Sequence, residues 1–120
     1  MMRGYDKEEA LLYILSKLDR SAHTVLSDRM DALISQAIDA DMEYMHAAGV
    51  LDEDGNAGDT YYEDDEAFEY IVEKIADENA FSPEQAVDAA LLINDYMELQ
   101  YAYMEKKGLV SNDPAAVPPK

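Results

Sequence analysis

The sequence predicts an all-α fold, a four-helix domain built from two repeated helix hairpins. Apolar residues recur every three or four positions in four separate segments, which is the period of a helix that buries one face. No segment shows the alternation of apolar and polar residues that a half-buried strand requires. The two halves of the chain also resemble each other. We therefore expect a short and a long helix, twice, related by a pseudo-twofold axis.

The first half is expected to form a helix over residues 7–18 and a longer one that ends at Gly49. Asp6 followed by Glu9 has the spacing of a capping box at the start of the first helix. Glycine is the residue that most often stops a helix in the left-handed conformation. The two apolar stripes consist of Leu11, Ile14, Leu15 and Leu18, and of Leu26, Met30, Leu33, Ala37, Ile38 and Met45.

The second half repeats this arrangement. Its start signal is the strongest in the chain, because Ser82 suits the cap, Pro83 the first helical position and Gln85 the capping-box position. We expect this fourth helix to span residues 83–107, before Gly108. The third helix carries the stripe Phe68, Ile71, Val72 and Ile75.

An internal duplication accounts for these parallels. Identical residues recur without a gap at an offset of 57 in the short helices, and then at an offset of 59 in the long ones. Two units are too few for an open array, so we expect one closed domain over residues 1–110. Its parts are repeat one (5–51), an acidic linker (52–61) and repeat two (62–110), followed by a flexible tail with prolines (111–120). The matched pairs are Glu9 with Glu66, Ala10 with Ala67, Tyr13 with Tyr70, Ile14 with Ile71, Lys17 with Lys74, Leu33 with Leu92, Ile34 with Ile93, Tyr44 with Tyr103, Met45 with Met104 and Gly49 with Gly108.

The composition excludes several classes of function. With 27 acidic against 9 basic residues, the net charge is −18, which disfavours direct binding of nucleic acid or of an anionic membrane. The absence of cysteine excludes a disulfide scaffold, a thiolate metal site and cysteine nucleophiles. No apolar stretch is long enough for a membrane span or a signal sequence. We expect a soluble, cytoplasmic protein.

No arrangement of residues predicts catalysis or a cofactor. The sequence contains no glycine-rich phosphate loop, no nucleophile elbow and no arginine clamp. Its carboxylates are so abundant that a pair of them does not indicate glycosidase or protease chemistry. Glu43 and His46 lie one helical turn apart, as in di-iron bundles, but the second half has Ala102 and Glu105 at the matching positions. We therefore expect a non-enzymatic protein without a cofactor, and a small enzyme of unknown reaction remains the least favoured alternative.

Residues 52–63 form a twelve-residue loop between two expected helices, with oxygen-bearing side chains at loop positions one, three, five, nine and twelve. This spacing resembles that of an EF-hand calcium loop. Two departures weaken this resemblance, because Ala57 occupies the position of the obligatory glycine and Asp59 that of an apolar anchor. A flexible acidic linker is therefore preferred, and specific calcium binding is kept as the alternative function. The candidate ligands are Asp52, Asp54, Asn56, Thr60 and Glu63.

Asp41 and Gln100 occupy matching positions in the two long helices, each four residues after a residue of the apolar stripe. An unpaired polar group on a buried stripe costs roughly 1 to 3 kcal/mol. The pair therefore either fixes the register or binds a ligand at the pseudo-twofold axis, or it lies at the solvated border of the stripe.

The charge pattern predicts a basic protein partner. Residues 31–73 contain no lysine or arginine, and carboxylates on successive helical turns stand roughly 5 to 6 Å apart, a spacing comparable with that of phosphates along a nucleic-acid strand. In charge alone the chain resembles, as a class, the acidic inhibitors of restriction and CRISPR nucleases and the nuclease immunity proteins. This resemblance implies a nucleic-acid mimic that blocks the basic surface of a nucleic-acid-handling enzyme. The fourth helix adds tyrosines and methionines for a partner or a homodimer. The candidate contact residues are Asp59, Glu63, Asp64, Asp65, Glu66, Glu69, Glu73, Tyr96, Tyr101, Tyr103 and Met104.

Overall fold

Four α-helices form the fold of the part of the chain that the structure, a computed structural model, describes, residues 2–109. They are α1 (Lys7–Lys17), α2 (Met30–Ala47), α3 (Asp64–Asn79) and α4 (Pro83–Lys106). Two 3-10 segments, η1 (Arg20–Ala22) and η2 (Thr24–Arg29), join α1 to α2. Within residues 2–109 the only β-type pairing is one isolated bridge between Leu51 and Ala57. The predicted all-α class is confirmed.

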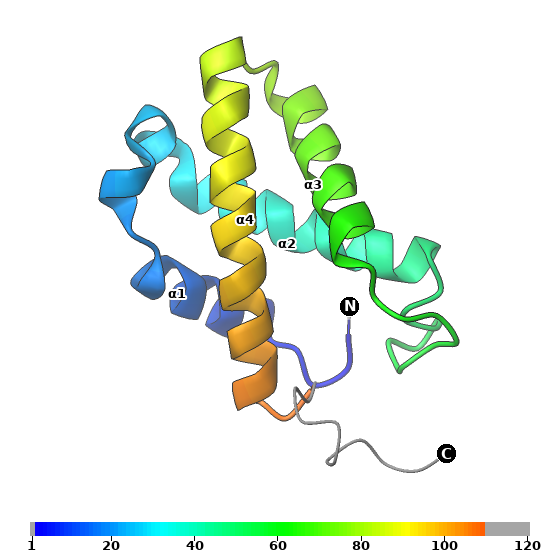
Figure 1. Ribbon diagram of the computed structural model, residues 1–120. Coiled ribbons are helices and arrows are strands. Elements are labelled where there is room, and N and C mark those ends of the chain that lie inside the picture. Colours follow the sequence, from blue (N-terminus) through cyan, green and yellow to red (C-terminus); the bar gives the residue numbers. More distant parts are fainter. Residues whose placement is uncertain (1, 110–120) are drawn as a thin grey trace.

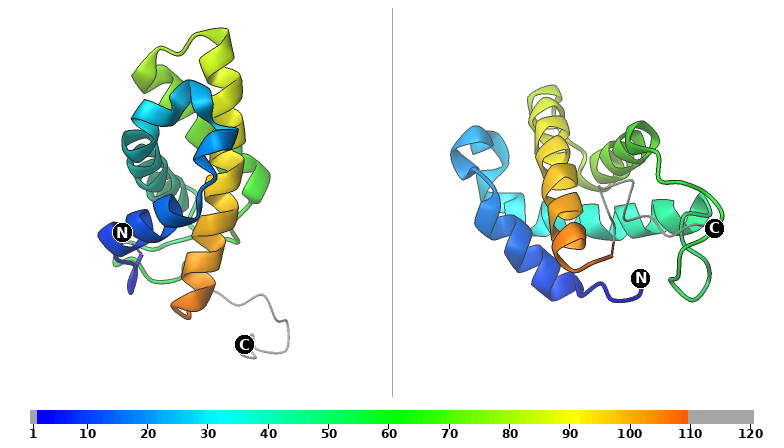
Figure 2. Two further views of the ribbon diagram at one scale, coloured as in Figure 1. Left: turned by 90° about the vertical axis from the view of Figure 1, so that its left-hand side faces the viewer. Right: turned by 60° about the horizontal axis from the view of Figure 1, so that its bottom comes forward.

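Each short helix packs against both long helices. α1 contacts α2 and α4, and α3 likewise contacts α2 and α4. Figure 1 shows α3 beside α4, with α2 passing behind both of them. The left view of Figure 2 shows the same crossing with α2 seen nearly along its axis. The shared core contains Ala10, Ile14, Leu33, Ile34, Ala37, Ile38, Met45, Ala67, Ile71, Ile75, Leu92 and Ile93, all of them buried.

The helix ends follow the local sequence signals with two exceptions. Ser82 accepts a hydrogen bond from the Gln85 amide, and the Gln85 side chain accepts one from the Ser82 amide, so the predicted capping box is confirmed. The box predicted at Asp6 is only half formed, because Asp6 accepts from the Glu9 amide while the Glu9 side chain binds Tyr103.

The second exception is the start of the second helix, which the apolar stripe placed near Leu26 and which begins at Met30. The preceding residues form 3-10 turns instead. Asp19 accepts hydrogen bonds from the amide and hydroxyl of Ser21, and this side-chain capping supports a tight turn. His23, at the junction of η1 and η2, binds carboxylates of α4, so tertiary contacts hold this segment against the helix.

Glycines end both long helices at matched positions. Gly49 and Gly108 have φ values of 81° and 75°, the left-handed conformation in which glycine carries no penalty. After Gly49 the loop folds back closely, and a Cβ atom on Gly58 would lie 2.2 Å from the Gly49 carbonyl oxygen. This close approach returns the chain to the start of α3. Within residues 2–109, no helix combines the length and apolar character needed to cross a bilayer.

Candidate functional site

The polar pair predicted from the stripe is buried at the centre of the bundle. Asp41 on α2 and Gln100 on α4 are 1% and 2% exposed. Tyr62 donates a hydrogen bond to Asp41 Oδ1 at 2.7 Å, and Tyr5 donates one to Gln100 Oε1 at 2.6 Å. Tyr62 and Tyr5 also occupy matched positions in the sequence. In both places a tyrosine hydroxyl donates to the buried polar residue of a long helix, which is Asp41 in one case and Gln100 in the other.

A second tyrosine completes the surroundings of Asp41. The hydroxyl of Tyr96, which is fully buried, donates to Asp41 Oδ2 at 2.7 Å. Burial raises the pKa of Asp41, and the hydrogen bonds from Tyr62 and Tyr96 lower it in part. Burial beside Asp41 also raises the pKa values of both tyrosines, so they stay protonated as donors. Within the described chain Asp41 forms no ion pair with a basic side chain. The centre of the bundle thus holds a carboxylate solvated by hydroxyl groups.

The contacts around this pair also recur at matched positions. Tyr103 on α4 donates to Glu9 on α1 at 2.9 Å, and Tyr44 on α2 donates to Glu66 on α3 at 3.1 Å. In each case the short helix of one half binds the long helix of the other half. The aromatic contacts are Tyr5 and Tyr13 with Tyr103, and Tyr62 and Tyr70 with Tyr44, with ring centroids 5.4 to 5.8 Å apart.

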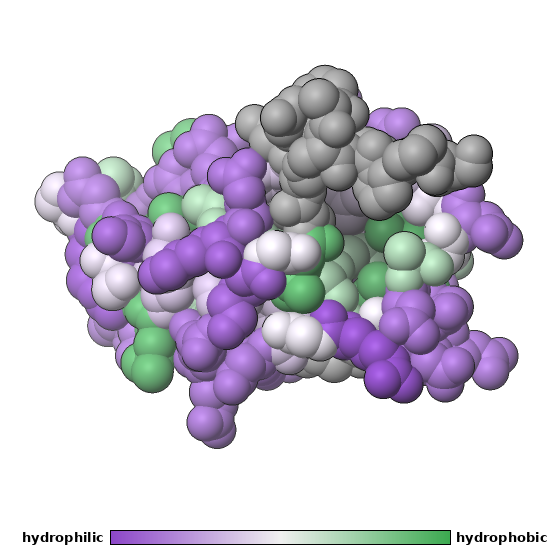
Figure 3. Space-filling model, turned by 90° about the horizontal axis from the view of Figure 1, so that it is seen from below, coloured by the Kyte–Doolittle hydropathy of each residue, from purple (hydrophilic) through white to green (hydrophobic). Residues whose placement is uncertain are grey.

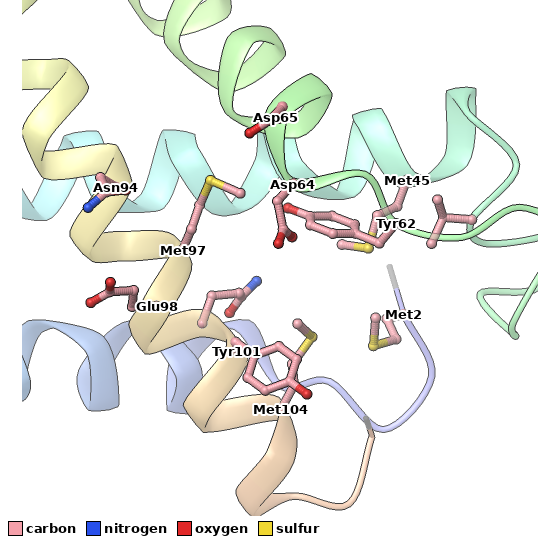
Figure 4. Close-up of a pocket in the computed structure, with 12 residues that line it drawn as sticks. Met2, Met45, Tyr62, Asp64, Asp65, Asn94, Met97, Glu98, Tyr101 and Met104 are labelled. Carbon is pink, nitrogen blue, oxygen red and sulfur yellow. The ribbon is translucent and has the colours of Figure 1, made fainter. Parts of the chain in front are cut away.

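A cleft of about 730 Å³ lies beside the pair, between the N-terminal segment, the end of α2, the start of α3 and α4. Methionines from three of these segments line it, as do Tyr62 and Gln100. Asp64 and Asp65 lie on the α3 side and Glu98 on the α4 side (Figure 4). Seen from below, hydrophobic side chains gather in a hollow bordered by hydrophilic ones (Figure 3). We call this feature the acidic cleft.

One exposed face of α3 carries a row of carboxylates at intervals of four residues, Asp65, Glu69, Glu73 and Asp77, of which Asp65 also lines the acidic cleft. All four are exposed, and within residues 2–109 none lies in an ion pair. The only lysine of α3, Lys74, pairs instead with Glu43 on α2 at 3.1 Å. We call these four residues the α3 row. The other acidic candidates, Asp59, Glu63, Asp64 and Glu66, are exposed as well.

Burial corrects the expectation that the tyrosines and methionines of α4 form a partner surface. Tyr96 and Tyr103 are core residues whose hydroxyls are used inside the bundle, and Met104 is buried where it lines the cleft. Tyr101, with 37% of its surface exposed, remains accessible, and Met97 is half-buried at the cleft. The expected partner surface included too many residues of α4, because this helix packs against other helices on more than one side.

The loop that resembles an EF-hand uses its first ligand for its own fold. Asp52 Oδ1 accepts hydrogen bonds from the amides of Asp54 and Asn56, each at 2.9 Å. The amide of Thr60 donates to the Gly49 carbonyl, which keeps the end of the loop against α2. Among residues 2–109, no group of three or more histidines and acidic residues is arranged to hold a metal ion.

Sequence reasoning missed an ion cluster around His23. The imidazole is 2% exposed, with Nδ1 at 3.1 Å from Asp88 and Nε2 at 2.7 Å from Asp95. Burial by itself would lower the pKa of His23, but hydrogen bonds and charge from Asp95 and Asp88 outweigh it, and the pKa is raised. The available signal was the seven-residue spacing of the two aspartates, which places them on one face of α4.

His23 is not placed to activate a nucleophile within the described chain. His23 contacts two carboxylates and no hydroxyl or amine that it could activate. Glu43, the partner proposed for His46 in a metal site, accepts hydrogen bonds from Lys74 and Tyr70 instead. Comparison of the chain with protein-family models, curated proteins and solved structures finds no match. The geometry itself is therefore the basis for a functional proposal.

Proposed function

We propose that the chain is a non-enzymatic, acidic binding module that acts in the cytoplasm on a basic protein surface. The observation that carries this proposal is the α3 row. Within the part of the chain that the structure describes, four exposed carboxylates stand on successive turns without a neutralising partner, along a helix whose only lysine is bound elsewhere. Such a row attracts lysines and arginines, increases the association rate and selects the orientation of docking.

The partner that best fits this row is a protein whose basic surface binds nucleic acid. Successive turns of a helix are 5.4 Å apart, so the row presents charges at a spacing comparable with that of phosphates along a strand. By occupying the basic surface, the module would block access of the nucleic acid. This function requires a rigid arrangement of carboxylates rather than a reactive group, which agrees with the hydrogen-bonded bundle underneath.

We further propose that the fold is a duplicated hairpin with pseudo-twofold symmetry, forming one domain over residues 1–110. The support comes from equivalent hydrogen bonds in the two halves, Tyr5 with Gln100 and Tyr62 with Asp41. The glycines that end the two long helices support it too. In this arrangement each half buries its apolar faces against the other half, so neither hairpin is complete alone.

Affinity capture tests the proposal. The chain is immobilised in a cell lysate, and the retained proteins are eluted with stepped salt or with competing duplex DNA. Basic nucleic-acid-binding proteins that DNA displaces are the expected result. Acidic proteins, or retention insensitive to salt and DNA, would contradict nucleic-acid mimicry.

A charge-matched pair of variants locates the contact. The row variant carries Glu69→Gln, Glu73→Gln and Asp77→Asn, and the control variant carries Glu8→Gln, Asp28→Asn and Glu105→Gln. Both raise the net charge by the same amount, and all six side chains are exposed without an ion pair in the described chain. Surface pairs contribute little individually, so we expect the row variant to lose roughly tenfold in affinity and the control to lose much less. Equal losses would show that the effect is one of net charge.

A further inference from the structure

The acidic cleft has the chemistry of a binding site for one kind of ligand. Met45, Met97 and Met104 contribute flexible, polarisable side chains to its lining, and such side chains adapt to an apolar group of varied shape. Carboxylates of α3 and of α4 lie on opposite sides of it (Figure 4). No lysine, arginine or histidine is among the described residues that line the cleft. The cleft therefore favours an apolar group that has cations on both sides.

An unused hydrogen-bond donor supports this assignment independently of the acids. Gln100 lines the cleft and is 2% exposed, and its buried Nε2 atom has no hydrogen-bond partner among residues 2–109. Its Oε1 atom is occupied by Tyr5, so the amide orientation is fixed. A buried donor without an acceptor is costly, and an oxygen atom of a ligand would satisfy it.

The buried polar centre of the bundle lies behind the lining of the cleft. Tyr62, which lines the cleft, donates a hydrogen bond to Asp41. Among the described residues, the groups that hydrogen-bond the Asp41 side chain are neutral hydroxyls. The attraction of the cleft for cations therefore comes from the acidic residues that line it, Asp64, Asp65 and Glu98.

We propose that the acidic cleft binds a basic peptide segment of the partner, with one apolar side chain between the methionines and flanking lysines or arginines at Asp64, Asp65 and Glu98. A peptide fits better than a small cation because the acids belong to two helices on opposite sides, so separate positive charges are needed. Its backbone also supplies the carbonyl oxygen that Gln100 Nε2 lacks. The inference rests on the proposed function and specifies how the partner is recognised.

Two synthetic peptides test this proposal by calorimetry with the full chain. The probe contains a single leucine flanked on both sides by lysine and arginine, and the reference peptide has serine in place of the leucine. Burying a leucine side chain predicts that the probe binds about tenfold or more tightly. Met97→Ser should remove this preference while leaving the salt dependence unchanged. Tyr101→Ser, at a more exposed position of the cleft, gives a second test should Met97→Ser disturb folding.

The role of the acidic residues that line the cleft is tested with two double variants that change the net charge equally. Asp64→Asn with Glu98→Gln should weaken the probe severalfold more than Asp28→Asn with Glu105→Gln, which changes the net charge equally outside the cleft. Equal binding of the two peptides, unaffected by Met97→Ser, would overturn the cleft proposal. The proposed function would still stand if the row variant lost its captured partner. A dimer that light scattering detects and that Met97→Ser dissociates would instead make the cleft an interface between copies, and would also overturn the proposal.

Discussion

Replacing Asp41 tests the central polar network of the bundle. Asp41→Ala removes the acceptor of two tyrosine hydroxyls, of which that of Tyr96 is fully buried and that of Tyr62 partly buried. Leaving Tyr96 unsatisfied costs about 1 to 3 kcal/mol, and the weaker loss at Tyr62 adds about 1 kcal/mol. Relief from burying a charge offsets part of this cost. We expect the free energy of unfolding to fall by about 1 to 3 kcal/mol.

Asp41→Asn is the matched control, because it keeps the shape and one acceptor oxygen while removing the charge. Burial raises the folded-state pKa of Asp41 above its ordinary value of 3.8, so the folded state binds the proton more tightly than the unfolded chain. The Asp41 contribution to stability is therefore largest below pH 3.8 and declines as the pH rises through the folded-state pKa. The asparagine variant lacks this decline.

Urea unfolding of the wild type and both variants at several pH values measures these effects. We expect the stability of the wild type relative to Asp41→Asn to decrease from acidic to neutral pH. An alanine variant as stable as the wild type, or a relative stability that increases with pH, would refute the description of Asp41 as a buried carboxylate held by hydroxyl donors.

Three further perturbations test other parts of the structure. The raised pKa of His23 predicts that its imidazole titrates by NMR with a midpoint above pH 6.5. Its contribution to stability should be complete below pH 6.5 and be lost as the pH rises through that midpoint. A midpoint below 6.5 would contradict the ion cluster. Gly58→Ala should destabilise the fold by about 2 kcal/mol or more, because the new Cβ atom would clash with the Gly49 backbone. Gly108→Ala, whose Cβ atom would meet no described atom within 4 Å, should cost about 1 kcal/mol for its positive φ angle alone. Equal losses of stability in thermal unfolding would argue against the close packing of the loop at Gly58. Ser82→Ala should cost about 1 kcal/mol in chemical unfolding through loss of the capping box, and an unchanged midpoint would contradict that role.

Local signals predicted the helices well where they act within one turn. The capping box at Ser82 is local chemistry, and its helix starts at the expected residue. The start of α2 was missed because the stripe from Leu26 is equally compatible with two 3-10 turns, which contacts from His23 to α4 stabilise. Periodicity describes which face is buried and does not determine the hydrogen-bond pattern of the backbone.

The candidate site was predictable only in part. The interruption of the stripe at Asp41 and Gln100 marked the polar centre, because a polar residue at a buried position needs partners. Its donors, Tyr5 and Tyr62, precede the short helices and reach the long helices of the opposite halves, so only the packing of the bundle brings them together. The cleft likewise combines the N-terminal segment, α2, α3 and α4. No single segment contains a signal for it.

The most direct test of the central claim, that outward carboxylates of α3 bind a basic partner, is an NMR footprint of the captured partner on the full chain. We predict that amide shifts change along the α3 row and around the acidic cleft, and that added salt reverses the changes along the row. Shift changes confined to α1 and the η1–η2 segment, or changes that salt leaves intact, would contradict the claim.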